Sequence, residues 1–254
     1  MHPVLFYIGS FPVMSYGVMA AIGVAVGILV VIREGRRLGR DPDGLLDLSL
    51  YLVLAGVIGS RLLYIAIEWE QFTGRPLDVF KIWEGGLSWF GSLAAGLAVA
   101  IWWTRRKGVR LNALGDLLAL GVAAGYPFGR IGCFLNGCCY GHPSDLPWAV
   151  AFPFDGVPRH PTQLYSLGFG VLIFAILWWR RKQKPFDGYL MWLYFLLYAG
   201  YRFIVDLWRE TPPGPDGLTI GQAGSLGVMV LAAAFLWRGW RHRSPRAGRQ
   251  PQDS

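Results

Sequence analysis

Long apolar stretches with few charges alternate with short polar connections along the whole chain. Seven of these stretches are about 18–20 residues long, the length at which a helix crosses the hydrocarbon core of a bilayer. They are residues 13–32, 48–67, 86–103, 111–128, 161–179, 188–205 and 218–237. Three of the stretches contain one charged residue each, which are Arg61, Asp116 and Arg202. The pattern predicts an all-α, polytopic membrane protein with seven transmembrane helices in a single integral-membrane domain, residues 1–254.

The composition supports this interpretation. The 254 residues are 54% hydrophobic and 16% charged, whereas a soluble domain carries about 25% charged residues. The 12 tryptophans are typical of chains whose aromatic rings lie at membrane interfaces. The three cysteines are too few for a disulfide framework. These numbers exclude a soluble globule and a disordered chain.

The basic residues predict the orientation. Most of them fall into four clusters between or after the apolar stretches: Arg33/Arg36/Arg37/Arg40, Arg105/Arg106/Lys107/Arg110, Arg180/Arg181/Lys182/Lys184 and Arg238/Arg241/Arg243/Arg246/Arg249. With seven spans, all four clusters lie on one side, which the positive-inside rule makes cytoplasmic. The N-terminus is then outside and the C-terminus is cytoplasmic. Because topology accounts for the net charge of +8, a nucleic-acid partner is not expected.

The densest polar segment, residues 125–141, follows the fourth predicted span at its outer end. It reads GYPFGRIGCFLNGCCYG and contains Arg130 and Asn136. Its glycines predict tight or irregular backbone at membrane depth. A guanidinium group at this depth can bind a phosphate with two parallel hydrogen bonds. The alternative is an arginine that snorkels to the membrane interface.

Three further segments place polar groups near the outer side. Tyr198, Arg202, Asp206 and Arg209 share one face of the sixth predicted span, either as an anion-binding arginine held by Asp206 or as a structural ion pair. Residues 159–165 read RHPTQLY and contain His160, which is a candidate proton acceptor or simply a solvated loop residue. Residues 83–91 read WEGGLSWFG, where the glycines equally fit close helix packing.

The cysteines Cys133, Cys138 and Cys139 lie on the predicted outer side, where the environment is oxidising. The cysteines are expected to be buried or in a disulfide, and a disulfide of Cys133 with one of the other two is favoured over a vicinal Cys138–Cys139 bond. A reactive thiol is an alternative. A metal site is a third alternative with little support, because these cysteines and the more distant His142 match no familiar zinc spacing.

Taken in order along the chain, these segments resemble the prolipoprotein diacylglyceryl transferase family. The matching motifs are Ser15–Gly17, Ala55–Tyr64, Trp83–Ser88, Gly129–Gly141, Arg159–Tyr165, Tyr201–Arg209 and Ile220–Gln222. The resemblance implies a bacterial cytoplasmic (inner) membrane enzyme whose site faces the outer leaflet. It implies transfer of the diacylglyceryl group from phosphatidylglycerol to the lipobox cysteine of a prelipoprotein, which forms a thioether and releases glycerol phosphate. Phosphatidylglycerol, prelipoprotein signal peptides and membrane lipids are then the partners, with no metal or cofactor.

The chemistry of this reaction agrees with the residues. A leaving phosphate ester gains negative charge, which preorganised cations stabilise. Arg130 and Arg202 are therefore the expected catalytic cations, and His160 is the candidate base. The expected substrate-binding residues are Arg130, Asn136, Gly141, Tyr16, Arg61, Gln163, Tyr165, Asp206 and Arg209.

The chain departs from the family pattern at three positions. Phe90 stands where many members carry His, Cys133 replaces an Asn, and Cys138 replaces a Glu. Because Phe90 occupies the position of the usual base candidate, Tyr16 and a bound water are alternatives to His160 as the proton acceptor. Two other functions stay open at this point: a divergent paralogue that acts on another thiol or anionic lipid, and a non-enzymatic transporter or redox partner.

Overall fold

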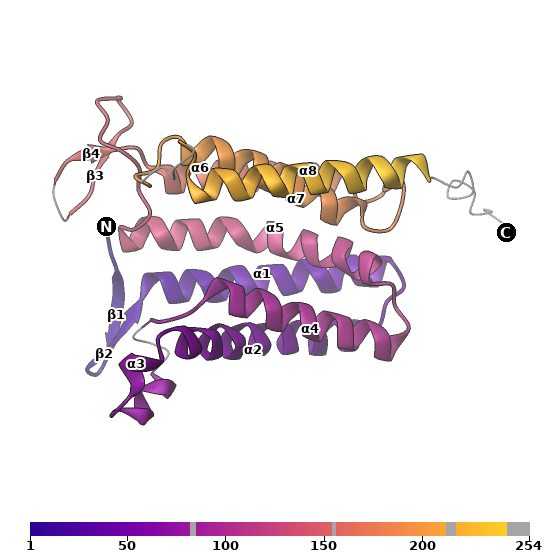
Figure 1. Cartoon of the computed structure of the whole chain (residues 1–254), viewed down its shortest axis with the longest axis horizontal. Coiled ribbons are helices and arrows are strands. Elements are labelled where there is room, and N and C mark those ends of the chain that lie inside the picture. Colours follow the sequence, from indigo (N-terminus) through magenta and orange to yellow (C-terminus); the bar gives the residue numbers. More distant parts are fainter. Residues whose placement is uncertain (82–84, 154–155, 212–216, 243–254) are drawn as a thin grey trace. The chain divides into compact units, whose positions relative to one another are not determined.

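A computed structural model describes residues 1–81, 85–153, 156–211 and 217–242. Trp83 and Glu84, and the basic residues after His242, lie outside the described residues. The helices are α1 (Ser15–Arg37), α2 (Pro42–Ile67), α3 (Trp69–Phe72), α4 (Trp89–Lys107), α5 (Leu111–Asn136), α6 (Thr162–Arg180), α7 (Tyr189–Asp206) and α8 (Ile220–Arg241), with a 3₁₀ helix η1 (Pro76–Phe80). Two antiparallel pairs of short strands are β1 (Val4–Ile8) with β2 (Phe11–Met14) and β3 (Val150–Ala151) with β4 (Pro158–Arg159) (Figure 1). The all-α prediction is thus confirmed, with two small sheets added.

Helices occur at all seven predicted places. Among the described residues, five of them (α1, α2, α5, α6 and α8) are long and apolar enough to cross a membrane. Helix α4 has 19 residues and ends in Arg105, Arg106 and Lys107, and α7 has 18 residues that include four tyrosines, Arg202 and Asp206. These polar side chains reduce the apolar character of α4 and α7. A multi-pass membrane protein is supported, while seven spans and the orientation stay predictions.

The chain divides into two compact units, residues 32–114 and residues 1–31 with 115–254. In the first of these, α2 packs along α4. A Cβ added at Gly91 would lie 2.2 Å from the Gly59 carbonyl oxygen, so only glycine permits this approach. The Ser92 Oγ donates to the Gly56 carbonyl at 2.8 Å across the same contact. The glycine-rich entry to α4 therefore serves close helix packing.

Arg61, the single charge of the second predicted span, is buried within the same unit. Its Nε donates to the Val79 carbonyl at 2.9 Å, and Nη1 donates to the Gly85 and Gly86 carbonyls at 2.8 and 3.1 Å. Its Nη2 donates to the Asp78 carbonyl at 2.6 Å. These bonds fix the connection between α2 and α4, and they give the buried arginine a structural role.

In the larger unit, α1 and α5 approach each other through paired glycines. A Cβ at Gly23 would lie 2.7 Å from the Gly125 carbonyl oxygen, and one at Gly27 would lie 2.9 Å from that of Gly121. Both pairs have the four-residue spacing of small-residue contacts in membrane helices. The middle of α5 is held against α1 in this way.

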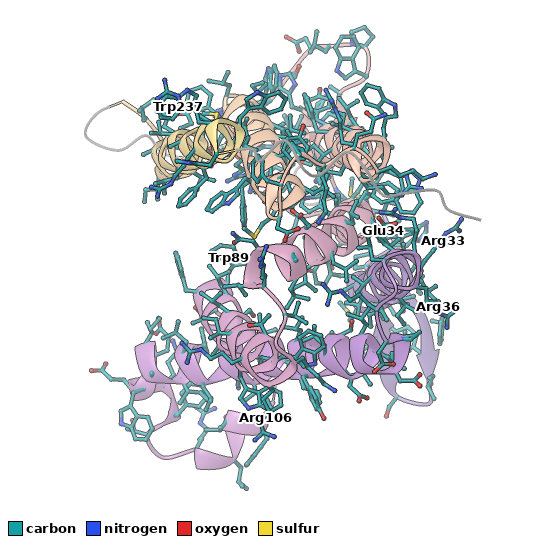
Figure 2. All side chains as sticks on the ribbon, turned by 90° about the vertical axis from the view of Figure 1, so that its right-hand side faces the viewer. Arg33, Glu34, Arg36, Trp89, Arg106 and Trp237 are labelled. Atoms are coloured by element: carbon teal, nitrogen blue, oxygen red, sulfur yellow. The ribbon has the colours of Figure 1, made fainter. Side chains whose placement is uncertain are left out.

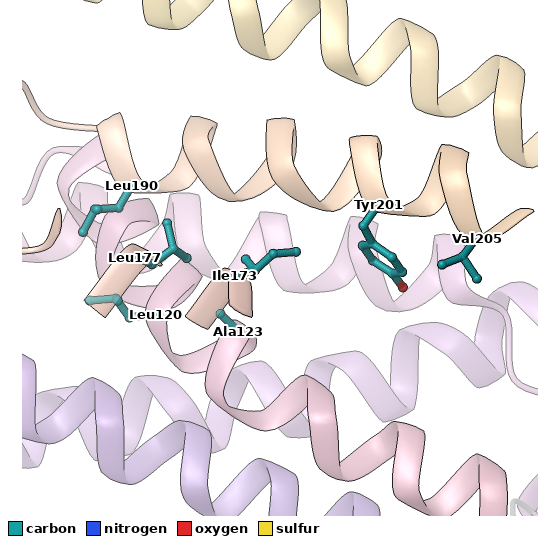
Figure 3. Packing of buried hydrophobic residues seen from close by; sticks show 7 residues of the cluster. All are labelled: Leu120, Ala123, Ile173, Leu177, Leu190, Tyr201 and Val205. Atoms are coloured by element: carbon teal, nitrogen blue, oxygen red, sulfur yellow. The ribbon is translucent and has the colours of Figure 1, made fainter. Parts of the chain in front are cut away.

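A buried apolar cluster joins α5, α6 and α7 (Figure 3). It consists of Leu120, Ala123, Ile173, Leu177, Leu190, Tyr201 and Val205. Helix α7 also packs against α8, and the three helices α6, α7 and α8 run side by side (Figure 1). This packing fixes the faces of α5 and α7 that carry the arginines.

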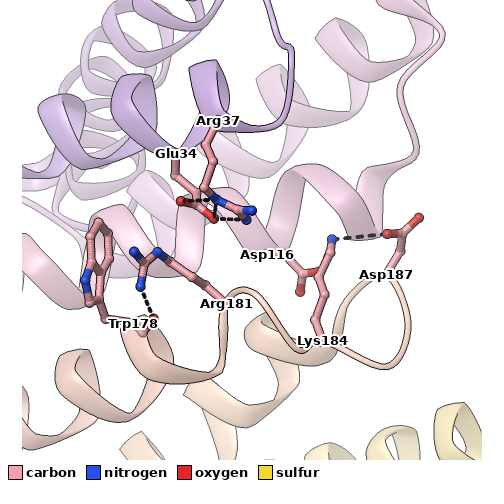
Figure 4. A network of polar contacts seen from close by, with 7 residues as sticks. All are labelled: Glu34, Arg37, Asp116, Trp178, Arg181, Lys184 and Asp187. Atoms are coloured by element: carbon pink, nitrogen blue, oxygen red, sulfur yellow. Dashed lines mark hydrogen bonds and ion pairs between the residues drawn. The ribbon is translucent and has the colours of Figure 1, made fainter. Parts of the chain in front are cut away.

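Asp116, the single charge of the fourth predicted span, anchors the connection from α6 to α7 (Figure 4). Its Oδ2 accepts from Lys184 Nζ at 3.0 Å and from the Gly188 N–H at 2.9 Å, and its Oδ1 accepts from the Met191 N–H at 3.1 Å. A buried carboxylate with these partners is satisfied. Asp116 is therefore a structural residue.

Basic side chains gather in the last turns of α1, α4, α6 and α8, where they complement the helix dipole. Arg33 and Arg36 project from α1, and Arg106 projects from α4 (Figure 2). Large apolar side chains are exposed along the helices, with Leu62 at 61% and Val230 at 69%. Such exposure is expected of helices that face lipid rather than water.

Candidate functional site

Helix α5 includes most of the polar segment 125–141, so the helix extends much further than the sequence suggested. The prediction of irregular backbone was wrong for residues 125–136, because Gly125, Gly129 and Gly132 are helical. A Cβ at Gly132 would lie 3.2 Å from both Tyr16 Cα and Met19 Cβ, so this glycine also serves contact with α1. The segment leaves the helix only at Gly137, which has a φ of +73°. Arg130 therefore projects from a rigid helix rather than from a loop.

Tyrosines hold the Arg130 guanidinium group. Its Nε donates to Tyr126 Oη at 2.7 Å, one helical turn away, and the group lies over the Tyr126 ring at 4.9 Å. The Tyr126 hydroxyl in turn shares a hydrogen bond with the Tyr201 hydroxyl of α7, and the Tyr198 ring packs edge-on against Tyr126. Among the described residues, no protein partner takes the terminal Nη groups of Arg130. Two parallel donors are thus oriented and available to an anion.

A second charged group centres on the buried carboxylate of Asp206 at the end of α7. Arg202 Nη2 lies 2.9 Å and Arg209 Nε 3.9 Å from Asp206 Oδ1. Thr219 donates its hydroxyl to Asp206 Oδ2 and also caps α8 through the Gln222 N–H at 3.0 Å. The carboxylate side chain is fully buried, whereas the two arginine side chains are 25% and 21% exposed. Asp206 therefore positions two guanidinium groups that keep access to an incoming ligand.

Gly141 joins three segments at this end of the molecule. Its N–H donates to the His160 carbonyl at 2.9 Å, and it forms an antiparallel bridge with Arg209. A Cβ at this position would lie 2.1 Å from the Trp208 carbonyl oxygen. Gly141 thus holds these three segments together through close backbone packing.

Gly141→Ala is expected to destabilise the protein. The added methyl group has to displace backbone, so the loss is about 3 kcal/mol, at the upper end of the range for overpacking. The measurement is the thermal denaturation midpoint in detergent micelles. Gly227→Ala is the matched control, because a Cβ there meets no atom within 4 Å and the residue lies inside α8. Equal midpoints for the two variants would contradict the prediction.

His160 lies beside an apolar pocket of about 510 Å³ at the start of α6. Its Nδ1 is 3.1 Å from Tyr165 Oη, which also accepts from Trp148 Nε1 at 2.8 Å. The Trp208 ring packs at 6.2 Å from the imidazole. The pocket is lined by Leu146, Trp148, His160, Leu164, Tyr165, Gly168, Phe169, Leu172 and Trp208. A pocket of this composition suits the apolar part of a substrate.

The three cysteines converge where α5 ends. Their Sγ atoms all lie within 4.8 Å of one another, and Cys139 Sγ is 3.3 Å from Cys138 Sγ. None of the three is in a disulfide, in contrast to the bond that the sequence favoured. The neighbouring Cys133 and Cys138 thiols, together with the positive charges of Arg209 and Arg130, lower the pKa of the Cys139 thiol, although burial opposes its ionisation.

The start of α6 secures the cysteine turn. Thr162 Oγ1 donates to the Cys139 carbonyl and Gln163 Nε2 donates to the Cys138 carbonyl, both at 2.6 Å. Asn136 is the last residue of α5 and lies two positions before Cys138. Gln163, a predicted substrate-binding residue, therefore contacts the cysteine turn directly, and Asn136, another, lies immediately before that turn.

The predicted residues of the larger unit form three neighbourhoods. Gln163 bonds to the cysteine turn that follows Arg130 and Asn136 at the end of α5, and Arg202 and Arg209 surround Asp206. Tyr16 lies at the start of α1, beside Gly132 of α5. His160 and Tyr165 line the pocket, and no hydrogen bond or ion pair between described residues joins His160 to Arg130 or Arg202. Arg61 belongs to the other compact unit, as does Phe90, whose side chain is 70% exposed at the start of α4.

Sequence reasoning missed several residues that the site uses. Tyr126 holds Arg130, Thr219 holds Asp206, and Trp208 covers His160. The four-residue spacing of Tyr126 and Arg130 on a helix was a usable signal. The partners of Asp206 and His160 come from distant segments, which no local pattern reveals.

Comparison with known proteins places the chain in a family. The model of the prolipoprotein diacylglyceryl transferase family matches residues 3–238. Relatives named phosphatidylglycerol–prolipoprotein diacylglyceryl transferase include one from Bordetella bronchiseptica, 36% identical over 92% of this chain and 94% of its own. Another, from Pseudoalteromonas atlantica, is 38% identical over 92% and 85%, and one from Geobacter sulfurreducens is 34% identical over 92% and 91%. The chain therefore belongs to the prolipoprotein diacylglyceryl transferase family.

Proposed function

We propose that this protein transfers the diacylglyceryl group of phosphatidylglycerol to the lipobox cysteine thiol of a prelipoprotein. The match to the family over residues 3–238 is the observation that carries this proposal. The reaction forms a C–S bond at the glyceryl carbon and breaks the bond from that carbon to the phosphate oxygen. Glycerol phosphate leaves with the electron pair, so the site has to stabilise a growing negative charge.

Arg130 is the proposed main contact to the phosphate. Its terminal donors are oriented by the Tyr126 hydroxyl and held over the ring, so little reorganisation is needed when the leaving group gains charge. Arg202 and Arg209 supply a second positive region around Asp206. A phosphate diester at headgroup depth fits such donors.

His160 is the proposed proton acceptor for the substrate thiol. Tyr165 orients its ring through Nδ1 at 3.1 Å, and the other ring nitrogen is then the one that faces the substrate. The apolar pocket beside it, of about 510 Å³, holds an apolar part of the substrate. Asn136, Gly141, Gln163 and Tyr16 support the site from the surrounding elements, whereas Arg61 holds the connection between α2 and α4 in the other unit.

His160→Ala is expected to lower kcat by about 10²–10⁴, the usual contribution of a general base. Turnover is measured as glycerol phosphate released per enzyme. His142→Ala is the matched control, since it removes another imidazole from the preceding loop. The His142 backbone bonds to Trp208 and His160, and its side chain has no hydrogen bond among the described residues. Unchanged kcat in His160→Ala would contradict this assignment and would indicate Tyr16 or a bound water as the proton acceptor.

The proposed topology has seven transmembrane spans in one membrane domain, with the N-terminus outside and the C-terminus cytoplasmic. Five described helices meet the length and hydropathy of a span, and the basic last turns of α1, α4, α6 and α8 fit a common cytoplasmic side. The site then faces the outer leaflet of the bacterial cytoplasmic membrane. Phosphatidylglycerol, prelipoprotein signal peptides and membrane lipids are the proposed partners.

The test is turnover by the purified protein in bilayers that contain phosphatidylglycerol. A lipobox peptide is added and released glycerol phosphate is quantified, with the Cys→Ser peptide as the control. We expect release only with the thiol peptide. Consumption of phosphatidylglycerol without modification of any lipobox peptide would instead indicate a different acceptor.

A further inference from the structure

The three cysteine sulfurs form the most concentrated set of soft donor atoms among the described residues. They lie within seven consecutive positions of the chain. Cys133 is in the last turn of α5, and Cys138 and Cys139 follow just after the helix. Their Sγ atoms lie within 4.8 Å of one another. Three thiolates bound to one zinc ion, each about 2.3 Å from the metal, would be separated by about 3.8 Å from one another. The observed cluster is close to that arrangement.

The backbone of the turn enforces the convergence. The Cys138 N–H donates to the Cys133 carbonyl at 3.1 Å, which folds the turn back over the helix end. Cys139 has a φ of +69° and is the only non-glycine residue with positive φ in the described part of the chain. This conformation is unfavourable for a residue with a Cβ, and such residues concentrate at functional sites.

The surroundings hold the turn in place independently of the sulfurs. Thr162 and Gln163 bind the Cys139 and Cys138 carbonyls through side-chain donors at 2.6 Å. The Gln163 Oε1 atom is buried without a hydrogen-bond partner in the described structure. Because its own amide nitrogen contacts the turn, this oxygen is an acceptor near the cluster, suited to a ligand that carries a proton.

A metal explains the cluster better than a disulfide does. Three thiols converge, whereas a disulfide would use two and leave the third without a role. The closest pair, Cys138 and Cys139, is adjacent in the chain, where a disulfide is strained. Thiolate ligands select zinc and other soft ions, and the positive charges of Arg130 and Arg209, which favour the thiolate form of Cys139, offset part of the negative charge of a three-thiolate site.

We propose that Cys133, Cys138 and Cys139 bind one zinc ion through three thiolates, and that the fourth ligand is the acceptor cysteine thiol of the substrate. This inference rests on the proposed function and deepens it. The described residues contribute three donors to the cluster, and catalytic zinc sites commonly combine three protein ligands with one exchangeable ligand.

Zinc coordination would solve the ionisation of the substrate thiol. A thiol that binds zinc loses its proton, which passes to water or to His160. The zinc-bound sulfur then donates an electron pair to the glyceryl carbon, and the carbon–oxygen bond breaks toward the departing phosphate ester. The thioether product has no thiolate charge and is a weaker ligand, so it leaves the metal. No electrons are gained or lost in the net reaction.

The test uses the full-length protein in detergent micelles, reduced and freed of metal with a chelator. Co(II) is added as a spectroscopic probe, followed by Zn(II). We expect one metal ion per chain and a sulfur-to-cobalt charge-transfer absorption that zinc abolishes. The absorption is lost in Cys139→Ser and retained in His142→Ala, which tests the other candidate ligand of this loop.

A second measurement adds the lipobox peptide to the Co(II) protein. The charge-transfer absorption is expected to increase with the thiol peptide, because the thiolates rise from three to four, and to stay constant with the Cys→Ser peptide. Glycerol phosphate release is expected to fall at least about tenfold on metal removal and to return with Zn(II).

Three results would overturn the proposal. Folded, reduced wild-type protein that binds neither Co(II) nor Zn(II), or that binds only Cu(I), would exclude a zinc site. A charge-transfer band that the thiol peptide leaves unchanged would exclude the substrate as fourth ligand. Full turnover by metal-free protein would exclude a role for zinc while leaving the transferase proposal intact. Absence of turnover both with and without metal would instead count against the transferase proposal, since the Co(II) spectra do not depend on turnover.

Discussion

Arg130→Ala is expected to lower kcat/KM for diacylglyceryl transfer by about 10³-fold. The loss follows because one removed donor to a developing anion costs about 10²–10³, and the main phosphate counter-charge is removed with it. Arg130→Lys is expected to recover little, since an ammonium group replaces the planar fork and loses the stacking on Tyr126. The measurement is glycerol phosphate release at several phosphatidylglycerol concentrations.

Two companion variants separate this role from general effects. Arg180→Ala removes a guanidinium from the end of α6, where the group lies over the exposed Trp179 ring, and should leave turnover unchanged. Tyr126→Phe keeps Arg130 but removes its Nε partner and the link to Tyr201, so an intermediate loss of kcat is expected. Near wild-type turnover of Arg130→Ala would contradict the assignment of Arg130 to the phosphate.

The positions of the long helices could be predicted from the sequence because burial in lipid leaves a direct pattern of uninterrupted apolar residues. Helix ends were less predictable. Helix α2 begins at Pro42, where Asp41 caps the Asp43 and Gly44 N–H groups, six residues before the apolar stretch. Helix α5 continues to Asn136 because its glycines serve contacts with α1 rather than a turn.

The meaning of the charges within the spans could not be predicted. Arg61, Asp116 and Arg130 look alike in the sequence, each a polar residue in or beside an apolar stretch. Arg61 and Asp116 form hydrogen bonds with distant backbone groups and are structural. The terminal donors of Arg130, in contrast, stay available to a ligand. Backbone partners have no sequence signature, so only the fold separates the two kinds.

The cysteine cluster shows a related difficulty. Spacing argued against a metal site, because Cys133, Cys138 and Cys139 do not match a familiar zinc motif. The convergence depends on positive φ at Gly137 and Cys139. A glycine can be expected to adopt such a conformation, but a cysteine cannot, because its Cβ opposes it. Tertiary support from Thr162 and Gln163 therefore overrides the local preference at Cys139.

Asp206→Asn is expected to cost about 2–4 kcal/mol in stability and most of the activity. The carboxylate is the common counter-ion of Arg202 and Arg209 and accepts the Thr219 hydroxyl. Its loss leaves two guanidinium groups without compensation at the junction of α7 and α8. The cost lies somewhat below that of a fully buried pair because these arginines are 25% and 21% exposed.

The measurements are the thermal denaturation midpoint in detergent micelles and glycerol phosphate release. Asp187→Asn is the control, as its carboxylate pairs with Lys184 at 3.2 Å but is 37% exposed; a change below about 1 kcal/mol is expected. A stable Asp206→Asn protein with unchanged turnover would show that the two arginines need no positioning.

Thr219→Val provides a quantitative comparison for Asp206→Asn. The hydroxyl both donates to Asp206 and caps α8, so the variant should lose about 1 kcal/mol from the cap and leave Asp206 paired with both arginines. If Asp206 acts by holding the guanidinium groups, Thr219→Val reduces stability with only a small change in kcat, whereas Asp206→Asn reduces both. Because a carboxylate between two arginines fixes where their charge is presented, the ratio of the two kcat losses separates electrostatic positioning from simple helix packing.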